Sequence, residues 1–184
     1  MRVHVTGATG YLGRELLRLE PGATTERVDV RHGAAVAGLL RRLRPDAVIH
    51  TAYRQHGPEA HAINALGSEN VARAAQEVGA RLVHVSTDVV FDGRLGRPYV
   101  EEDAPTPCSE YGRSKADAEA RVAAAAPGAV LARTSLLVGG PGHEPSPHEL
   151  AAHAPEAVFF DDELRSPVQV TDLAAALLEL TELE

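Results

Sequence analysis

Tryptophan is absent from the 184-residue sequence, and cysteine, methionine and lysine occur once each. Because Cys108 is the only cysteine, an internal disulfide and a thiolate metal cluster within one chain are both excluded. No apolar stretch approaches the roughly 20 residues of a membrane-spanning helix. The N-terminus also runs straight into a strand pattern, where a signal peptide would have a longer apolar run. We therefore expect a soluble, cytoplasmic protein with no membrane partner.

Positive charge is scarce as well. The chain has 18 Lys+Arg against 26 Asp+Glu, so its formal net charge is −8, and it lacks a long basic run. This balance argues against nucleic acid as the main partner. Nine histidines are present, but His143, His148 and His153 are five residues apart and do not share a helical face. With no carboxylate pattern to complete a site, we predict no metal centre.

What the sequence does contain is an alternation of strand-like and helix-like apolar blocks. Strands are expected at residues 3–6, 47–50, 81–86 and 129–132, and helices at 10–19, 34–43, 59–78 and 111–126. Several strands are apolar on both faces, which is typical of a parallel sheet covered on two sides. The prediction is a doubly wound, Rossmann-like α/β fold. Two regions fit poorly: residues 19–28 have room for one short strand only, and 139–155 indicate a loop with at most one helical turn, near 148–153.

A glycine-rich turn follows the first strand and opens the first helix. It consists of Gly7, Ala8, Thr9, Gly10, Tyr11, Leu12 and Gly13. Glycines allow a phosphate to approach the backbone, and a helix N-terminus offers unpaired N–H donors. The spacing G-x-x-G-x-x-G differs from the dinucleotide fingerprint G-x-G-x-x-G, and such a turn can be a tight connection only. Its place between strand and helix favours a pyrophosphate site.

An acidic residue is expected about 20 positions after such a turn, where it binds a ribose hydroxyl. Asp29 lies at that distance from Gly10. It fits equally well as a polar residue that ends a strand. Arg31 could instead meet a 2′-phosphate, so the residues leave NAD and NADP both open.

The predicted helix at 111–126 begins with Tyr111 and places Lys115 one turn later. This spacing also occurs in many ordinary surface helices, but Lys115 is the only lysine of the chain, which favours a functional role. A nearby cation favours the phenolate and should lower the tyrosine pKa from about 10. Ser86 and Thr87 end a central strand, where ligands of open parallel sheets bind. Thr87 could therefore hydrogen-bond a substrate carbonyl, although such a hydroxyl often serves a turn or a helix start.

These segments together resemble the dTDP-4-dehydrorhamnose reductase family of the extended short-chain dehydrogenases/reductases. The resemblance is carried by Ser86-Thr87-Asp88-Val89-Val90-Phe91-Asp92-Gly93, by Pro98-Tyr99-Val100-Glu101-Glu102-Asp103, and by Tyr111-Gly112-Arg113-Ser114-Lys115. It extends from Gly7 to the segment Thr171-Asp172-Leu173-Ala174 and so covers most of the chain.

The resemblance implies an NAD(P)H-dependent reductase of a nucleotide-linked 4-keto-6-deoxy sugar. Tyr111 would be the catalytic acid, Lys115 would bind the nicotinamide ribose, and Thr87 would position the carbonyl. The implied cofactor-binding residues are Gly7, Thr9, Gly10, Tyr11, Leu12, Gly13, Asp29, Ala52, Ser86, Tyr111 and Lys115. Asp29 would lie near the adenine, and Asn64 would support the active-site helix.

Residues 1–138 would form the dinucleotide-binding domain, and 139–184 a reduced substrate-binding portion that returns to the core. Family members are considerably longer, and the substrate loop expected near residues 54–57 is short and basic. These departures keep two alternatives open: a non-catalytic dinucleotide- or sugar-nucleotide-binding regulatory subunit, and a sugar-nucleotide epimerase or dehydratase. A homodimer is left open too.

Overall fold

Four parallel strands form the centre of the protein in a computed structural model that describes residues 1–140, 142–159 and 161–183. They are β1 (Val3–Thr6), β2 (Ala47–His50), β3 (Arg81–Thr87) and β4 (Val130–Thr134), and they lie in the order β1-β2-β3-β4. All three pairings are parallel, and the register places His50 of β2 opposite His84 of β3. All four expected strands are confirmed, with bounds within one residue of those expected except that β4 ends two residues later than expected. The carboxyl ends of all four strands lie at one edge of the sheet.

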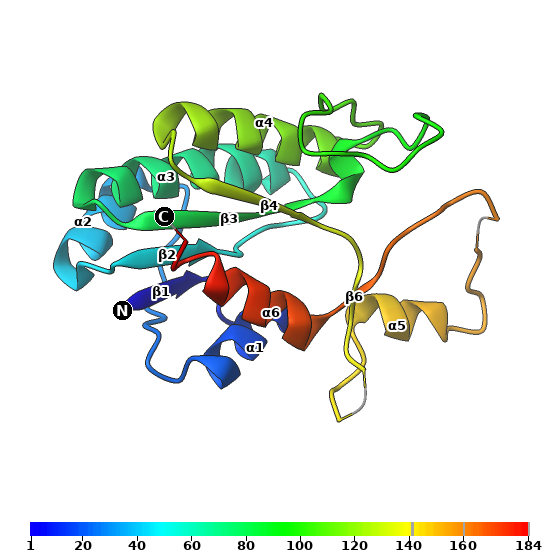
Figure 1. Ribbon diagram of the computed structural model, residues 1–184, viewed down its shortest axis with the longest axis horizontal. Coiled ribbons are helices and arrows are strands. Elements are labelled where there is room, and N and C mark those ends of the chain that lie inside the picture. Colours follow the sequence, from blue (N-terminus) through cyan, green and yellow to red (C-terminus); the bar gives the residue numbers. More distant parts are fainter. Residues whose placement is uncertain (141, 160, 184) are drawn as a thin grey trace.

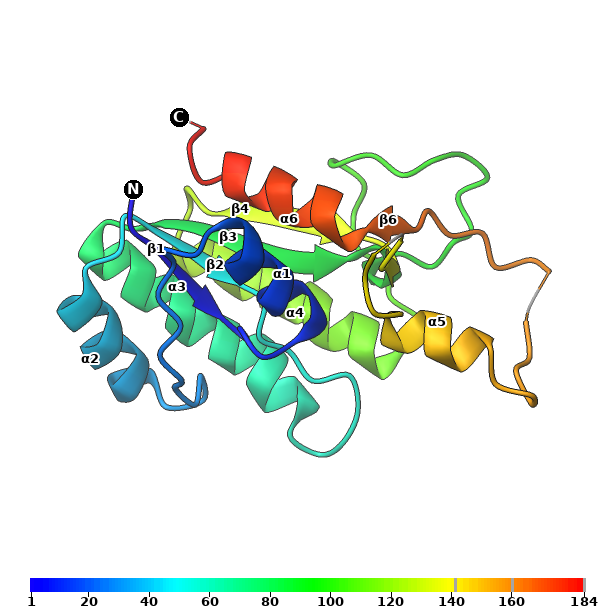
Figure 2. The ribbon, with the colours of Figure 1, turned by 90° about the horizontal axis from the view of Figure 1, so that it is seen from below.

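Helices cover both faces of this sheet (Figures 1 and 2). On one face lie α2 (Gly33–Leu43), α3 (Gly67–Val78) and α4 (Glu110–Ala125), and on the other lie α1 (Tyr11–Leu19) and α6 (Val170–Glu179). A π-helical turn, η1 (Ala62–Leu66), leads into α3, which ends at Gly79 in the left-handed conformation (φ 70°). The doubly wound α/β class is therefore confirmed.

Two hydrophobic cores hold these layers together, one on each side of the sheet. Val36, Leu40 and Val71 are buried between the sheet and helices α2 to α4. Leu16 of α1 and Leu177 of α6 are fully buried on the opposite side. Burial of each such side chain is worth about 1.5–3 kcal/mol, so both helical layers are anchored firmly around the edge where the strands end.

The short strand expected within residues 19–28 is reduced to a single bridge. Thr24 pairs with His4 beside β1: the Thr24 N–H donates to Val3 O and the Val5 N–H donates to Thr24 O, both at 2.9 Å. The next residues, 25–27, are exposed and polar. They have no apolar face to bury, so the pairing ends after one bridge.

The segment after β4 contains the one helical turn that the sequence indicates, α5 (Pro147–Ala152). Ser146 starts it with a capping box: its hydroxyl accepts from the Glu149 N–H at 3.2 Å, and the Glu149 carboxylate accepts from the Ser146 N–H at 2.7 Å. Two short parallel strands, β5 (Leu137–Val138) and β6 (Val168–Gln169), flank this segment. Figure 1 shows α5 and β6 at the end of the molecule toward which β3 runs.

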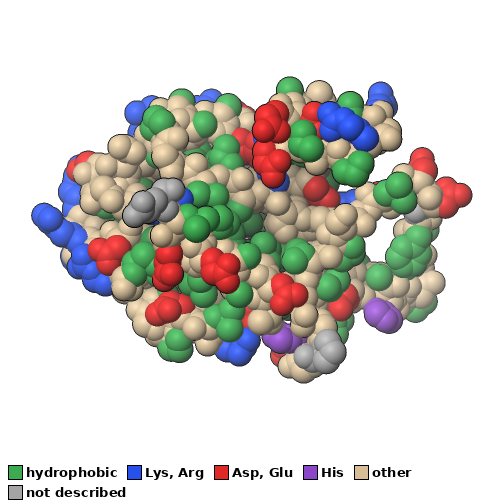
Figure 3. All heavy atoms as spheres, in the orientation of Figure 1, with side chains coloured by type: hydrophobic (Ala, Val, Ile, Leu, Met, Phe, Trp, Pro, Cys, Tyr) green, Lys and Arg blue, Asp and Glu red, His purple; other side chains and the backbone are tan. Residues whose placement is uncertain are grey.

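Arg41 and Arg42, near the end of α2, lie on the surface. Figure 3 shows Lys and Arg side chains gathered at the left edge, over α2. There Arg41 pairs with Glu77 at 2.5 Å, and Arg42 pairs with Glu26 at 2.5 Å. These cations are thus matched by acidic neighbours. Within the described residues, no helix is both long enough and apolar enough to cross a membrane.

Candidate active site

The glycine turn between β1 and α1 is built so tightly that two of its positions accept only glycine. Gly7 has φ 72°, and a Cβ there would lie 2.6 Å from the backbone nitrogen of Ala52. A Cβ on Gly13 would lie 2.4 Å from the carbonyl oxygen of Gly7. Gly7 thus brings the turn directly against Ala52, another of the predicted cofactor-binding residues.

The start of α1 is left without a cap from the chain itself. Gly10 is the N-cap residue, no side chain caps the helix, and its first turn has no acidic residue. Helix α4, by contrast, is capped by the hydroxyl of Ser109. Because uncapped N–H groups and the positive end of the helix favour an anion, the exposed backbone at Thr9 and Gly10 fits a phosphate group. Leu12 is buried in the core and can contribute only through its backbone.

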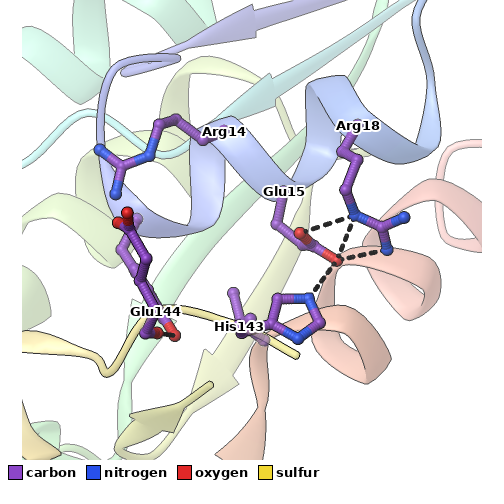
Figure 4. A pocket seen from close by; sticks show the side chains of 7 residues that line it. Arg14, Glu15, Arg18, His143 and Glu144 are labelled. Atoms are coloured by element: carbon purple, nitrogen blue, oxygen red, sulfur yellow. Dashed lines mark hydrogen bonds and ion pairs between the residues drawn. The ribbon is translucent and has the colours of Figure 1, made fainter. Parts of the chain in front are cut away.

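Tyr11 and Glu15 of α1 hold the segment 142–146 over the start of the helix. The Tyr11 hydroxyl donates to the carbonyl oxygen of Glu144 at 2.7 Å. Glu15 is 6% exposed; its carboxylate accepts from the Thr171 hydroxyl at 2.7 Å and lies 3.3 Å from His143 Nε2. Figure 4 shows this hollow, in which Glu15 lies between His143 and Arg18. The Tyr11 hydroxyl is thus occupied, which leaves its backbone for a ligand.

Asp29 and Arg31, the two residues considered for the ribose end of a dinucleotide, bind each other. The Arg31 guanidinium donates to the Asp29 carboxylate at 2.7 and 2.9 Å and also pairs with Glu59. Arg31 thereby lowers the pKa of Asp29 far below its usual range. Asp29 ends no strand, because it lies in an irregular segment just before the turn at Val30 and Arg31. The interpretation of Asp29 as a strand end is therefore wrong.

At the end of β3, Thr87 lies at the edge of the sheet and caps a short 3-10 turn, η2 (Asp88–Val90). Its hydroxyl accepts from the Val89 N–H at 3.4 Å and donates to the Asp88 carboxylate at 3.3 Å. The adjacent Ser86 is 3% exposed, and its hydroxyl has no hydrogen-bond partner within the described part of the chain.

Helix α4 packs directly on the segment that carries Thr87. A Cβ at Gly112 would lie 2.3 Å from the carbonyl oxygen of Val89, so glycine lets the first turn of α4 approach η2. The buried Asn64 fixes the same turn from η1, because its side-chain amide donates to the Ser114 hydroxyl at 2.9 Å. Asn64 thus supports the helix, as the resemblance implies.

Tyr111 lies in the first turn of α4, where its ring is 5.9 Å from the ring of Tyr53 between centroids. Burial raises the pKa of Tyr111 well above its usual value, and the neighbouring Tyr53 and Asp88 raise it further. The prediction that Lys115 lowers this pKa is therefore wrong for the protein alone. Since the phenol stays protonated, it is suited to donate a proton rather than to accept one.

Lys115, one turn along α4, turns its amine inward onto β3. Lys115 Nζ donates to the carbonyl oxygen of Val85 at 2.7 Å and lies 3.2 Å from Nε2 of His84. The residue is 2% exposed, and burial lowers the pKa of its amine to about 8. The amine therefore lies against Val85 of β3, two residues before Thr87. It does not point into bulk solvent, and the reductase hypothesis depends on this.

Three of the residues around this edge could not be predicted from local sequence patterns: Tyr53, His84 and Arg165. Arg165, from the segment before β6, binds Asp88 through two N–H groups at 2.8 and 2.9 Å. This contact joins residues 77 positions apart, so no local pattern could have revealed it. His84 lies in the middle of β3, and a histidine at such a position is usually interpreted as a core residue.

The chain is similar to several known proteins. The chain matches the family described as the RmlD substrate binding domain over residues 1–184. It is 39% identical, over 193 residues, to a dTDP-4-dehydrorhamnose reductase of Mycobacterium tuberculosis; this match covers 97% of the chain and 62% of that protein. It is also 31% identical, over 215 residues, to methionine adenosyltransferase 2 subunit beta of Xenopus tropicalis, with 98% and 62% covered.

A solved structure shows the same fold. The dTDP-4-dehydrorhamnose reductase of Bacillus anthracis in complex with NADP superposes with a TM-score of 0.86 and 32% identity, covering 99% of this chain and 71% of that one. The chain spans 62% of the length of each of the two relatives from Mycobacterium tuberculosis and Xenopus tropicalis, which is somewhat less than two thirds.

Proposed function

Because the chain belongs to the RmlD substrate binding domain family, we propose that it is an NAD(P)H-dependent reductase of a nucleotide-linked 4-keto-6-deoxy sugar. The observation that carries the proposal is the packing of α4 against the end of β3. This packing puts the helix of Tyr111 and Lys115 on the segment that carries Thr87, with the amine buried on β3 and the phenol beside Asp88.

The glycine turn supports binding of the dinucleotide. Gly7 and Gly13 let the turn close tightly on its own backbone and on Ala52. The exposed backbone at Thr9 and Gly10 and the uncapped start of α1 would offer N–H donors and a positive dipole end to a pyrophosphate. The relative from Bacillus anthracis is in complex with NADP. When bound, the reduced nicotinamide would supply the hydride. The pair of Asp29 and Arg31 lies where the adenosine end would be recognised, and either nicotinamide form is compatible with it.

The chain's own residues would handle the carbonyl. The Thr87 hydroxyl would hydrogen-bond the carbonyl oxygen, and the Tyr111 phenol, kept protonated by burial, would pass its proton to the developing alkoxide. Lys115 would hold the nicotinamide ribose through an N–H group. This division of work puts a proton donor and a hydrogen-bond donor on the same oxygen, as reduction of a ketone requires.

The proposal also predicts a partner and a cellular location for the protein. The small-molecule partner would be the sugar nucleotide, and the location would be the cytoplasm, where reduced nicotinamide is available. The division into a dinucleotide-binding domain at 1–138 and a substrate-binding portion at 139–184 stays a prediction, as does a homodimer.

Titration with NADPH and with NADH, followed by turnover of a dTDP-4-keto-6-deoxy sugar, tests the function. Tyr111→Phe should reduce turnover by about 10²–10⁴-fold while nicotinamide binding persists, because only the acid is lost. Tyr99→Phe makes the same chemical change in a surface loop, where Tyr99 contacts Asp92, and should leave turnover unchanged. Wild-type rates in Tyr111→Phe would rule out its role as the acid.

A non-catalytic regulatory subunit is the second candidate, favoured by the 31% identity to a relative that is named a subunit. The two candidates differ in one measurement. Tight binding of NADPH with no turnover of any 4-keto sugar nucleotide by the wild type would support the subunit and refute the reductase. Conversion of a sugar nucleotide that carries no ketone, with no net oxidation of NADPH, would instead indicate an epimerase or dehydratase.

A further inference from the structure

The imidazole of His84 contacts the amine of Lys115. Neither the sequence analysis nor the proposed reaction assigns a role to His84. His84 is completely buried, and its Nε2 lies 3.2 Å from Lys115 Nζ. We propose that His84 is a positioning residue that holds the Lys115 amine on β3 by accepting a hydrogen bond at Nε2. Its consequence for turnover rests on the proposed function, whereas the contact itself does not.

The chemistry of the two groups fixes the protonation of the ring. A lysine ammonium has three N–H donors and no lone pair, so it can bind only a ring nitrogen that carries a lone pair. Nε2 of His84 must therefore be unprotonated, and the ring proton lies on Nδ1. Burial, Lys115 and the neighbouring His50 lower the pKa of His84 well below its usual value, which keeps the ring neutral and able to accept.

Other charged and titratable groups around the amine do not replace this contact. On α4 itself, Glu119 lies one turn beyond Lys115, but its carboxylate is held by Arg133 from β4 at 2.8 Å. From β2, the ring of His50 lies 5.3 Å from that of His84 between centroids, and its nitrogens contact Thr6 and Ser68. Among the described residues, no carboxylate forms an ion pair with Lys115. The amine is thus held by Val85 and His84.

His84 holds the amine but does not conduct its proton. Nδ1 of His84 is buried and has no hydrogen-bond partner among the described residues, so a proton taken up at Nε2 would have no onward acceptor. The contacts with Val85 and His84 use two of the three N–H groups of Lys115. One N–H group remains for a ribose hydroxyl, and the two contacts with β3 fix the direction in which it points.

Lys115 is the only lysine, so a sample with isotope-labelled lysine gives one side-chain NMR signal that needs no assignment. We would titrate that signal in the wild type and in His84→Gln, His84→Leu and His84→Asn. The wild type should titrate near pH 8. In His84→Gln the amide oxygen can occupy the place of Nε2, so the midpoint should stay close to that of the wild type.

In His84→Leu the acceptor is lost, and the pKa of Lys115 should fall by about one unit, because an acceptor stabilises the charged form. His84→Asn keeps a polar side chain that is too short to reach the amine. His84→Asn should lower the pKa of Lys115 by the same amount, and it replaces His84→Leu in the test if that variant does not fold. His4→Leu removes an equally buried imidazole from β1 and should leave the midpoint in place. Wild-type midpoints in both His84→Leu and His84→Asn would overturn the proposal.

Turnover separates this inference from the proposed function. If the protein is a reductase, His84→Leu should lower kcat roughly tenfold and move its alkaline limb to lower pH along with the lysine pKa, and His84→Gln should restore both. If the wild type shows no turnover, the reductase proposal fails, while the NMR titration still decides whether His84 holds Lys115. Normal turnover with unshifted lysine pKa values would refute the role of His84 alone.

Discussion

The buried amine of Lys115 should make the stability of the protein rise with pH in a range where few other groups titrate. Burial lowers the pKa of Lys115 from 10.5 to about 8. Between these two values the unfolded chain keeps the lysine proton, while the folded protein gives it up. Because the unfolded state then binds more protons, the free energy of unfolding increases as the pH rises through this range. Lys115→Met removes the titrating group but keeps a long side chain.

The size of the effect follows from the shift. A difference of about 2.5 pKa units corresponds to roughly 3.4 kcal/mol between the two protonation states. Integrated over the range from pH 7 to pH 10, the wild type should gain about 2.5 kcal/mol in unfolding free energy relative to Lys115→Met. The variant also leaves Val85 O and His84 Nε2 without their donor, but that loss is the same at every pH in this range. It therefore changes the offset between the two curves and not their slope.

Urea unfolding followed by circular dichroism measures this difference, since the chain has no tryptophan for fluorescence. Both proteins would be unfolded at several pH values from 7 to 10. Tyrosines of an unfolded chain titrate near pH 10, but both proteins contain the same tyrosines, so their contribution cancels in the comparison. Two curves that stay parallel within about 0.5 kcal/mol would show that Lys115 titrates normally, and the burial argument would then be refuted.

Three further outcomes are expected. Gly13→Ala should destabilise the fold by about 1–3 kcal/mol in urea unfolding, because its Cβ would clash with backbone. Gly38→Ala is the control: a Cβ there meets nothing within 4 Å inside helix α2, so the substitution should stabilise the fold by about 0.5–1 kcal/mol. Equal effects of the two substitutions would refute the steric account. Contacts with Arg18, Thr171 and His143 lower the pKa of Glu15 to about 2. The stability that Glu15 contributes is therefore present above pH 4.5 and is lost as the pH falls toward 2. Glu15→Gln should make the unfolding free energy less dependent on pH in this acid range, and an unchanged acid unfolding curve would contradict the argument. Arg165→Leu frees Asp88 and should speed hydrogen exchange at β6 with a global loss of about 1 kcal/mol or less, because the pair is partly exposed; unchanged exchange there would contradict a tethering role.

Local patterns in the sequence determined most of the architecture. The spacing of apolar residues predicted the four strands and the helices between them, because each pattern reflects which face of an element is buried. Gly79 ended α3 as expected, since only glycine adopts its left-handed conformation without strain. The order of strand, glycine turn and helix likewise located the candidate phosphate site.

The sequence was less informative where neighbours far along the chain decide the outcome. The sequence leaves room for one short strand within residues 19–28, but only the Thr24 bridge beside β1 forms. Asp29 looked available to a ribose, but it binds Arg31, whose guanidinium is also held by Glu59, 28 positions further along the chain. Neither result follows from propensity, because both depend on which groups meet after folding.

The same division runs through the candidate active site. The sequence by itself pointed to Thr87, Tyr111 and Lys115 as candidates, since the motifs that carry the family resemblance and the one-turn spacing on a helix are local properties. Only the tertiary structure decided their electrostatics. Packing of α4 on β3 removes water from the phenol and the amine, which raises the pKa of Tyr111 and lowers that of Lys115. It also places His84 beneath the amine from another element, and solvation and contacts of this kind exist only once distant segments are packed together.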